Sequence, residues 1–265
     1  MNTFTEITIK SRGPIYTLTI NKPEKKNILS PLCLKEIEAA IGKLSTKQDL
    51  RVLVITGQGN EAFCAGYDLE ALPCSEDKLA WEALDRIPPL EAALSAIESF
   101  PYPVLAMMNG YAYGGGCELA LSCDIRVAAQ RVTMAMTALK LGLVYPQKGL
   151  ERFIRKIGLA STIEMFFSAR PYISEQCLRL GLVNVVVEDD QLERYTYELA
   201  SEIALRPPLA LRGTKKAIYT LASSPPIDDK AIAELKYLFK RSLLSQDHLE
   251  RRKAFLQGRS REERG

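Results

Sequence analysis

Histidine is almost absent from this chain of 265 residues, because His248 is the only one. A site built from several histidines, as in most catalytic zinc centres, is therefore excluded. Any mechanism that pairs an imidazole with a serine or cysteine nucleophile would depend on this one residue, close to the C-terminus. We expect His248 to lie on the surface or at a subunit interface rather than to act in catalysis.

Long apolar runs and a marked charge excess are also missing. No apolar run approaches the roughly 20 residues that span a bilayer, and no apolar signal segment follows Met1. The net charge is +3, and it comes from residues 248–265, so that the remainder balances at 29 basic against 29 acidic residues. We therefore expect neither a membrane nor a nucleic acid as partner. The six cysteines form no CxxC pair, which favours reduced thiols and a cytoplasmic location.

What is present is the composition of an ordinary globular protein, with 47% hydrophobic and 25% charged residues. Residues 1–190 alternate strand and helix patterns, whereas residues 191–265 show helices alone. Strands are predicted at 4–20 (a hairpin), 51–57, 103–110, 124–129 and 182–187. Helices are predicted after Ser30, near Cys117, at 150–158, from Ser174, and at 191–205, 208–222, 227–244 and 246–257, while 73–89, with Trp81, is predicted to be a loop with a short helix.

Two glycine-containing turns carry the strongest chemical signal. They are AFCAGYDL (62–69) and NGYAYGGGCEL (109–119). Each follows a predicted buried strand and leads towards a helix start, where backbone N–H groups have no partner within the helix. Two such donors aimed at one point would form an oxyanion hole. Taken singly, either turn is better explained as a tight connection that packs a helix on a sheet.

These two motifs, together with LKLGLV (139–144), SARPYISEQCLRLGLVNVVV (168–187) and SQDHLERRKAFLQGR (245–259), resemble the signatures of the enoyl-CoA hydratase/isomerase (crotonase) superfamily. The resemblance covers essentially the whole chain. It implies an α/β (α+β) fold, a spiral of ββα units with two roughly perpendicular sheets, and a C-terminal helical region that forms homotrimers or dimers of trimers. It also implies an enzyme of acyl-CoA or fatty acid metabolism that needs no separate cofactor, since CoA is part of the substrate.

The resemblance assigns catalytic roles to three positions. The backbone N–H groups of Tyr67 and Gly115 would hold the thioester oxygen, and Glu118 would be the catalytic carboxylate. Without the resemblance, Glu118 is an acid in the first turn of a helix, where a capping role is common. The Tyr67 side chain is open to two interpretations, a wall of the substrate pocket or a packed surface group.

The resemblance also suggests where CoA lies. Lys25 and Lys26 would meet phosphates, unless they belong to a solvated turn, and Lys240 and Arg252 are further cations that could reach them. Other positions around the pantetheine and acyl chain are Pro23, Asn27, Cys64, Ala65, Gly66, Asp68, Leu69, Gly114, Ala138 and Tyr145. Cys117 is interpreted as a structural residue.

One departure from the family pattern affects the expected reaction. Where the hydratases carry a second glutamate, this chain has Ala138, and Tyr145 replaces a usual proline. Hydration by a pair of carboxylates is therefore disfavoured. The first expectation is still a reaction of the hydratase/isomerase type with Glu118 as general acid/base, either double-bond isomerisation or a weak or substrate-assisted hydration. Decarboxylation, C–C cleavage, thioester hydrolysis and non-catalytic acyl-CoA binding are the alternatives. Tyr113 and Tyr145 are either substitutes for the missing acid or apolar walls with a polar tip.

Overall fold

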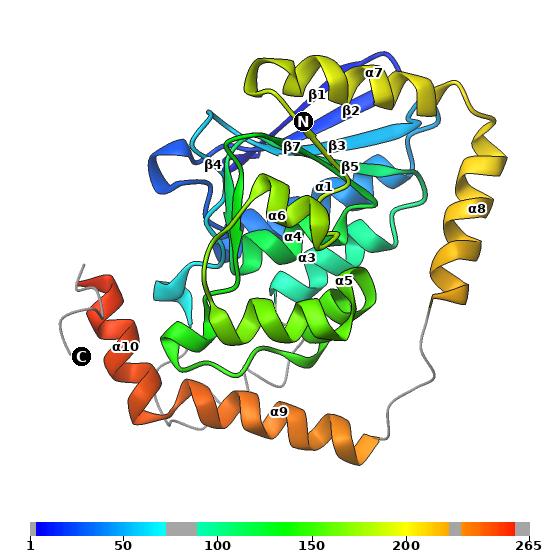
Figure 1. Ribbon diagram of the computed structural model, residues 1–265. Helices are drawn as coiled ribbons and strands as arrows, with labels where there is room; N and C mark the ends of the chain where they lie inside the picture. Colours follow the sequence, from blue (N-terminus) through cyan, green and yellow to red (C-terminus); the bar gives the residue numbers. More distant parts are fainter. Residues whose placement is uncertain (1–3, 73–88, 223–228, 258–265) are drawn as a thin grey trace.

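The computed structural model describes residues 4–72, 89–222 and 229–257, so the predicted loop with Trp81 lies outside the described residues. Figure 1 shows the arrangement of its elements. The strands are β1 (Ile7–Arg12), β2 (Ile15–Ile20), β3 (Val52–Gly57), β4 (Ala62–Cys64), β5 (Val104–Met108), β6 (Tyr111–Tyr113), β7 (Ile125–Ala129), β8 (Thr133–Ala135), β9 (Tyr172–Ile173) and β10 (Val185–Val187). The α-helices are α1 (Pro31–Ser45), α3 (Pro89–Glu98), α4 (Gly115–Ser122), α5 (Gln147–Ser168), α6 (Ser174–Arg179), α7 (Leu192–Ala204), α8 (Pro208–Leu221), α9 (Asp229–Leu243) and α10 (Gln246–Leu256).

The larger sheet follows the predicted strands closely. Its order is β1-β2-β3-β5-β7-β10, with the β1–β2 hairpin antiparallel and the other neighbours parallel. Every residue of β3 is buried, which agrees with its continuous apolar sequence. Helix α7 packs on β2, β3, β5 and β7, and in Figure 1 it lies across the sheet on the side opposite α3 and α4.

The resemblance implies a second sheet, and the structure has one in the order β4-β6-β8-β9, but its strands were not predicted from the sequence pattern. Its strands have two or three residues each, too few for an alternating pattern to be recognised. Along the chain, β3, β5 and β7 enter the larger sheet, and each is followed by a strand of the smaller sheet and then by a helix. This repetition is the spiral of ββα units that the resemblance implies, and it confirms the predicted fold class.

The helices begin and end close to their predicted limits. The Ser30 side chain accepts a hydrogen bond from the Cys33 N–H and so caps α1, with Pro31 in the first helical position. Gly158, with φ of 77°, interrupts α5 where a helix end was predicted. Helix α4 starts at Gly115, two residues before the predicted Cys117. The four C-terminal helices are all present.

The described cysteines Cys33, Cys64, Cys117, Cys123 and Cys177 are buried and free of disulfides. Among the described residues, no helix is long and apolar enough to cross a membrane.

Candidate functional site

The two glycine turns meet because β4 and β6 are parallel neighbours in the smaller sheet. The first turn follows β4 and the second follows β6, and the carboxyl ends of parallel strands lie at the same edge of a sheet. A Cβ built on Gly115 would be 3.2 Å from the Tyr67 nitrogen, and one built on Gly66 would be 3.3 Å from the Gly115 nitrogen. The structure therefore brings together the two backbone groups that the sequence singled out.

Both nitrogens are free to donate to a ligand. A parallel bridge uses the Leu29 N–H on the Gly66 carbonyl and the Asp68 N–H on the Leu29 carbonyl, so the intervening Tyr67 N–H points away from Leu29. Gly115 is the first residue of α4, where the N–H has no partner within the helix. In the described part of the chain, neither N–H has a hydrogen-bond acceptor.

Glycine is needed at each of the three consecutive positions 114, 115 and 116 for a different structural reason. Gly114 adopts φ of 51° and ψ of −118°, a conformation that other residues rarely reach. Gly115 is the donor, and a Cβ on Gly116 would be only 2.1 Å from the Cys64 carbonyl oxygen. Gly116 therefore permits the close approach of α4 to the end of β4, which positions the donor pair.

Glu118 lies one turn into α4 and faces α5, with only 3% of its surface exposed. Both carboxylate oxygens are engaged: Arg152 donates to Oε1, and the hydroxyl of Tyr145 donates to Oε2. Gly149 makes room for this arrangement, because a Cβ there would be 2.3 Å from Cε1 of Tyr145 and 3.0 Å from Oε1 of Glu118. The Glu118 carboxylate is therefore held by hydrogen bonds from two side chains, and helix capping alone does not explain its position.

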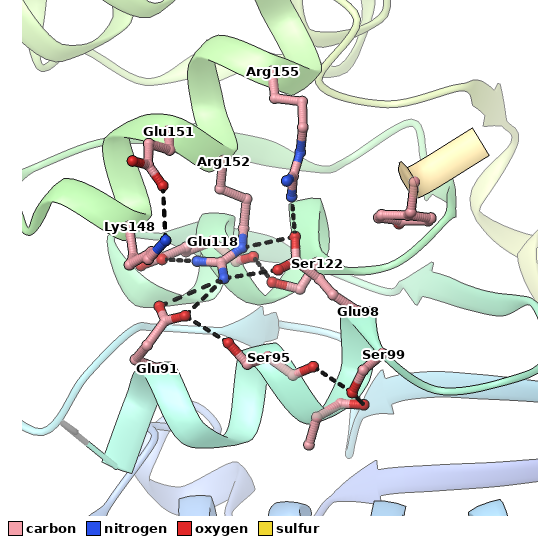
Figure 2. A network of polar contacts seen from close by, with 12 residues as sticks. Glu91, Ser95, Glu98, Ser99, Glu118, Ser122, Lys148, Glu151, Arg152 and Arg155 are labelled. Atoms are coloured by element: carbon pink, nitrogen blue, oxygen red, sulfur yellow. Dashed lines mark hydrogen bonds and ion pairs between the residues drawn. The ribbon is translucent and has the colours of Figure 1, made fainter. Parts of the chain in front are cut away.

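Arg152 is the centre of the network in Figure 2. Its guanidinium, 3% exposed, reaches down from α5 between α4 and α3. Besides Glu118 it contacts Glu98 through Nε at 3.1 Å and Nη2 at 3.0 Å, and it contacts Glu91 at 3.4 Å. Arg155 adds a second cation, 2.5 Å from Glu98.

Burial is the main influence on the pKa values of Glu118 and Tyr145. It raises the pKa of Glu118, while the positive charge of Arg152 and the hydrogen bond from Tyr145 oppose the rise. The pKa of Tyr145 lies well above its usual value, because burial and the neighbouring Glu118 carboxylate both disfavour the phenolate. Tyr145 is therefore a proton donor in this arrangement and not a base.

The two tyrosines that were weighed as substitutes for a missing acid have different surroundings. Tyr145 donates to Glu118 and packs edge-on against Phe166. Tyr113 instead shares a hydrogen bond of 3.1 Å with Thr133 and packs against the Tyr111 ring. Ala138 is buried at the start of the short 3₁₀ segment Ala138–Leu141, and it supplies no polar side chain.

Two of the segments proposed to surround CoA, the Pro23–Asn27 loop and the first glycine turn, lie side by side. Ala65 N–H donates to the Lys26 carbonyl at 3.0 Å, which links the Pro23–Asn27 loop to the first glycine turn. The Lys26 side chain pairs with Glu61 and is 44% exposed, and Lys25 is exposed. Asn27 is buried and bridges backbone groups, including the Ala62 carbonyl at 2.8 Å, so its role here is structural.

The remaining residues of the first turn are less accessible. The Cys64 side chain is buried and its pKa is raised to about 12, so it is a neutral thiol. Asp68 caps the short 3₁₀ segment Leu69–Ala71 by accepting from the Glu70 N–H. Cys117, as predicted, is buried, and burial raises its pKa well above the ordinary value.

The C-terminal helix α10 folds back on the same chain. Arg252 donates to the carbonyls of Leu69 at 2.8 Å and Glu70 at 3.3 Å, so it reaches the predicted CoA segment within one subunit. His248 is fully buried, and its Nδ1 lies 2.7 Å from the Leu141 carbonyl. The prediction of a surface or interface histidine was therefore wrong, because the sequence did not reveal which face of α10 packs against residues 138–141. Lys240 lies on α9 and is partly buried.

Sequence reasoning missed Arg152 and its partners Glu91 and Glu98. An arginine and two glutamates on amphipathic helices are normally solvated, and only the packing of α3, α4 and α5 shows that they are partly or fully buried. The one available signal was the seven-residue spacing of Tyr145 and Arg152 around Gly149, which suits one helical face. Within the described residues, no group of three or more His, Cys, Asp or Glu side chains is arranged to hold a metal ion.

Known proteins resemble this chain over nearly its whole length. The enoyl-CoA hydratase/isomerase family model matches residues 10–261. The 2,3-dehydroadipyl-CoA hydratase of Escherichia coli is 33% identical over 261 residues, which cover 98% of this chain and 99% of that protein. Methylmalonyl-CoA decarboxylase of Escherichia coli is 26% identical over 96% of this chain and 95% of its own length.

Solved structures show the same fold. Methylmalonyl-CoA decarboxylase in complex with 2-nitronate-propionyl-CoA superposes with a TM-score of 0.90 at 26% identity, over 97% of this chain and 98% of that one. An enoyl-CoA hydratase from Bacillus anthracis gives a TM-score of 0.77 at 28% identity, over 96% and 97% of the two chains. The architecture is thus that of a crotonase-fold enzyme. The chain belongs to the enoyl-CoA hydratase/isomerase family.

Proposed function

We propose that this protein is an acyl-CoA enzyme of the hydratase/isomerase type that stabilises a thioester enolate between the Tyr67 and Gly115 N–H groups. The observation that supports it is the pair of unoccupied backbone donors on adjacent turns. Fixed donors stabilise an oxyanion without any titrating group, and the single histidine is then not required.

Glu118 is the proposed proton-transfer residue. In an isomerisation its carboxylate takes a proton from the carbon next to the thioester, and the electron pair moves onto the carbonyl oxygen. The same proton is then delivered to the far carbon of the original double bond. The electron pair on oxygen re-forms the carbonyl, and the new double bond lies next to it. One carboxylate suffices for this sequence, whereas hydration by two carboxylates lacks its second member at Ala138.

Glu118→Gln tests this assignment, because the amide keeps the shape but cannot accept the proton. We expect turnover to fall by at least about 100-fold while acyl-CoA binding changes little. Binding can be measured by calorimetry with crotonyl-CoA, and Glu38→Gln on the exposed face of α1 is a matched control. Full activity of the Glu118 variant contradicts the proposal.

Decarboxylation of a malonyl-type CoA ester is a second candidate. It is favoured by Ala138, by the engagement of both Glu118 oxygens, and by the similarity to methylmalonyl-CoA decarboxylase. Here the bond to the carboxylate breaks, CO₂ leaves, and the electron pair passes to the oxyanion before a proton reaches the α-carbon. The same donor pair serves both reactions.

A substrate panel separates these reactions. Crotonyl-CoA reports hydration, a 3-enoyl-CoA reports isomerisation, methylmalonyl-CoA reports CO₂ release, and a β-ketoacyl-CoA reports C–C cleavage or hydrolysis. Turnover of the 3-enoyl ester alone supports the first proposal, and release of CO₂ alone supports the second. Binding of all four esters without turnover supports a non-catalytic acyl-CoA-binding protein.

No separate cofactor takes part in the proposed reactions, and the free thiols of the described cysteines favour a cytoplasmic location.

We further propose self-association as a homotrimer or a dimer of trimers. Helix α8 has no buried residue, and Leu209 and Leu221 are 77% and 85% exposed, with Leu205 just before the helix at 84%. Leucines exposed to this extent along one helix are typical of an interaction surface. Light scattering of Leu209→Lys should show a smaller species than the wild type, whereas Leu32→Lys on α1 should not. A wild-type monomer contradicts this proposal.

A further inference from the structure

Arg152 is one buried cation shared by three carboxylates from two helices. Glu91 and Glu98 lie on α3 and Glu118 lies on α4, as Figure 2 shows. Of the three side chains, Glu118 is the most buried at 4%, compared with 16% for Glu98 and 21% for Glu91. Glu118 is therefore the carboxylate that depends most on Arg152, because water solvates the other two better.

The negative charges in this network exceed the positive ones. Arg152 and Arg155 face Glu91, Glu98 and Glu118, so one negative charge is left over. Glu91 raises the pKa of Glu118, and Arg152 lowers it. The charge on Glu118 is thus the result of a competition in which the α3 carboxylates draw on the same guanidinium.

We propose that Arg152 is a positioning residue that holds Oε1 of Glu118, leaves Oε2 to Tyr145 and the transferred proton, and connects this carboxylate to α3. The inference rests on the proposed role of Glu118 in proton transfer. The side chain of Arg152 contacts the three carboxylates and not the Tyr67 or Gly115 nitrogen, so it would act through Glu118.

The connection to α3 links the carboxylate to the oxyanion site. Leu90 lies 3.7 Å from the position of a Cβ on Gly115, so the first turn of α3 borders the donor pair. The next residue, Glu91, contacts Arg152. One turn of α3 therefore contacts both halves of the proposed machinery, and a change in the Arg152 network alters the position of Glu118 relative to the two N–H groups.

Glu118 is surrounded by ionisable side chains from α3, α4, β4 and the start of α5. Arg152 belongs to α5, Tyr145 precedes α5, and Glu91 and Glu98 belong to α3. Cys117 lies beside Glu118 on α4 and is a buried neutral thiol. Cys64, at the end of β4 against which α4 packs, is also neutral. Arg152 is therefore the one cation in direct contact with Glu118 among the described residues.

The positioning role of Arg152 is tested by variants that remove a positive or a negative charge from the network. Arg152→Met removes the cation and should raise the pKa of Glu118, so that the acid limb of kcat moves to higher pH and kcat below that pH falls about tenfold per pKa unit. Arg152→Lys should restore part of the shift. Glu98→Gln removes a competitor and should move the limb to lower pH. KM should change less than kcat in all three variants.

Arg194→Met is the matched control, since Arg194 also pairs with a glutamate on its own helix, Glu198, but lies on α7 and contacts none of the three carboxylates of the Arg152 network. It should leave the pH profile close to that of the wild type. If Arg152→Met does not fold, Arg152→Lys and Glu98→Gln still predict shifts in opposite directions. Profiles of these two variants that coincide with the wild type overturn the inference.

A second readout does not require turnover. The carboxyl carbon of Glu118 can be titrated by NMR in protein labelled with ¹³C-glutamate, with the signal assigned through Glu118→Gln. An unchanged titration in the Arg152 variants overturns the inference even if the enzyme's reaction differs from the one proposed. A shifted titration with an unchanged kcat profile instead overturns the catalytic role of Glu118, and with it the positioning role of Arg152.

Discussion

Glu118 in the spiral core and His248 in the C-terminal helices are both buried ionisable residues, but their partners differ. Each Glu118 oxygen has a donor, whereas His248 has one backbone partner on Nδ1, and Nε2 has none among the described residues. Burial raises the pKa of Glu118 and lowers that of His248, so in both cases it favours the neutral form. Only the core provides a cation that opposes this effect. The core therefore places a compensating charge beside Glu118, whereas at His248 the neighbouring Arg252 adds to the effect of burial.

The largest effect that would test this contrast is loss of the core cation. Arg152→Ala leaves Glu118 buried without its ion pair, and removal of one partner from a buried pair typically costs about 3–5 kcal/mol. Urea denaturation should show this loss in the free energy of unfolding. Arg155→Ala is the control, because Arg155 is 32% exposed and should cost less than about 1 kcal/mol. Equal losses would mean that the core does not depend on its buried cation.

A smaller loss in the free energy of unfolding is expected when a methyl group is added at Gly149, beside Tyr145 and Glu118. Gly149→Ala places a Cβ where the Tyr145 ring and the Glu118 carboxylate leave no space, and overpacking costs about 1–3 kcal/mol. Thermal and urea denaturation measure the loss, and the tyrosine signal in near-ultraviolet circular dichroism should change. Gly42→Ala in α1 has free space around it and should stabilise the protein by about 0.5–1 kcal/mol. A neutral Gly149 variant would show that Tyr145 has room to move away from Glu118.

The smallest effect concerns His248 and depends on pH. As the pH falls below about 6.5, the unfolded chain binds a proton at this residue before the folded chain does, because the folded pKa is lowered. The stabilisation is therefore complete above pH 6.5 and is lost as the pH falls through the folded pKa. His248→Leu should lack this part of the pH dependence.

Urea denaturation of both proteins between pH 5 and 8 tests this prediction. At pH 8 the two should differ by about 1 kcal/mol, the value of one hydrogen bond to the Leu141 carbonyl. Arg252, the charged neighbour that lowers the histidine pKa, remains in both proteins. Parallel pH profiles would mean that His248 takes up its proton as easily in the folded chain as in the unfolded one.

Much of the fold could be predicted from sequence, because the strands of the larger sheet and the four C-terminal helices have clear local patterns. The limits of β3 and β5 were within two residues of prediction, and Ser30 and Gly158 act as expected. The strands β4, β6, β8 and β9 were missed, since they have no more than three residues each. They are stabilised by pairing with one another, which a local pattern does not record.

For the site, the glycine turns and Glu118 were visible in the sequence, as was the loss of a carboxylate at Ala138. The choice between Tyr113 and Tyr145 was not, because both are aromatic residues next to glycine-containing turns. It follows from the docking of α5, which places the Tyr145 hydroxyl on Glu118, while β8 provides Thr133 to Tyr113.

The sequence by itself determined the family, the two glycine turns and the position of one carboxylate, because each motif consists of residues close together in the chain. Only the tertiary structure decided the partners of Glu118 and the burial of His248. Arg152 and Glu118 are 34 positions apart, and His248 and Leu141 are 107 apart. Contacts at such separations depend on which helix faces meet. Helical periodicity identifies an apolar face, but it does not identify the polar side chains that become buried beside it.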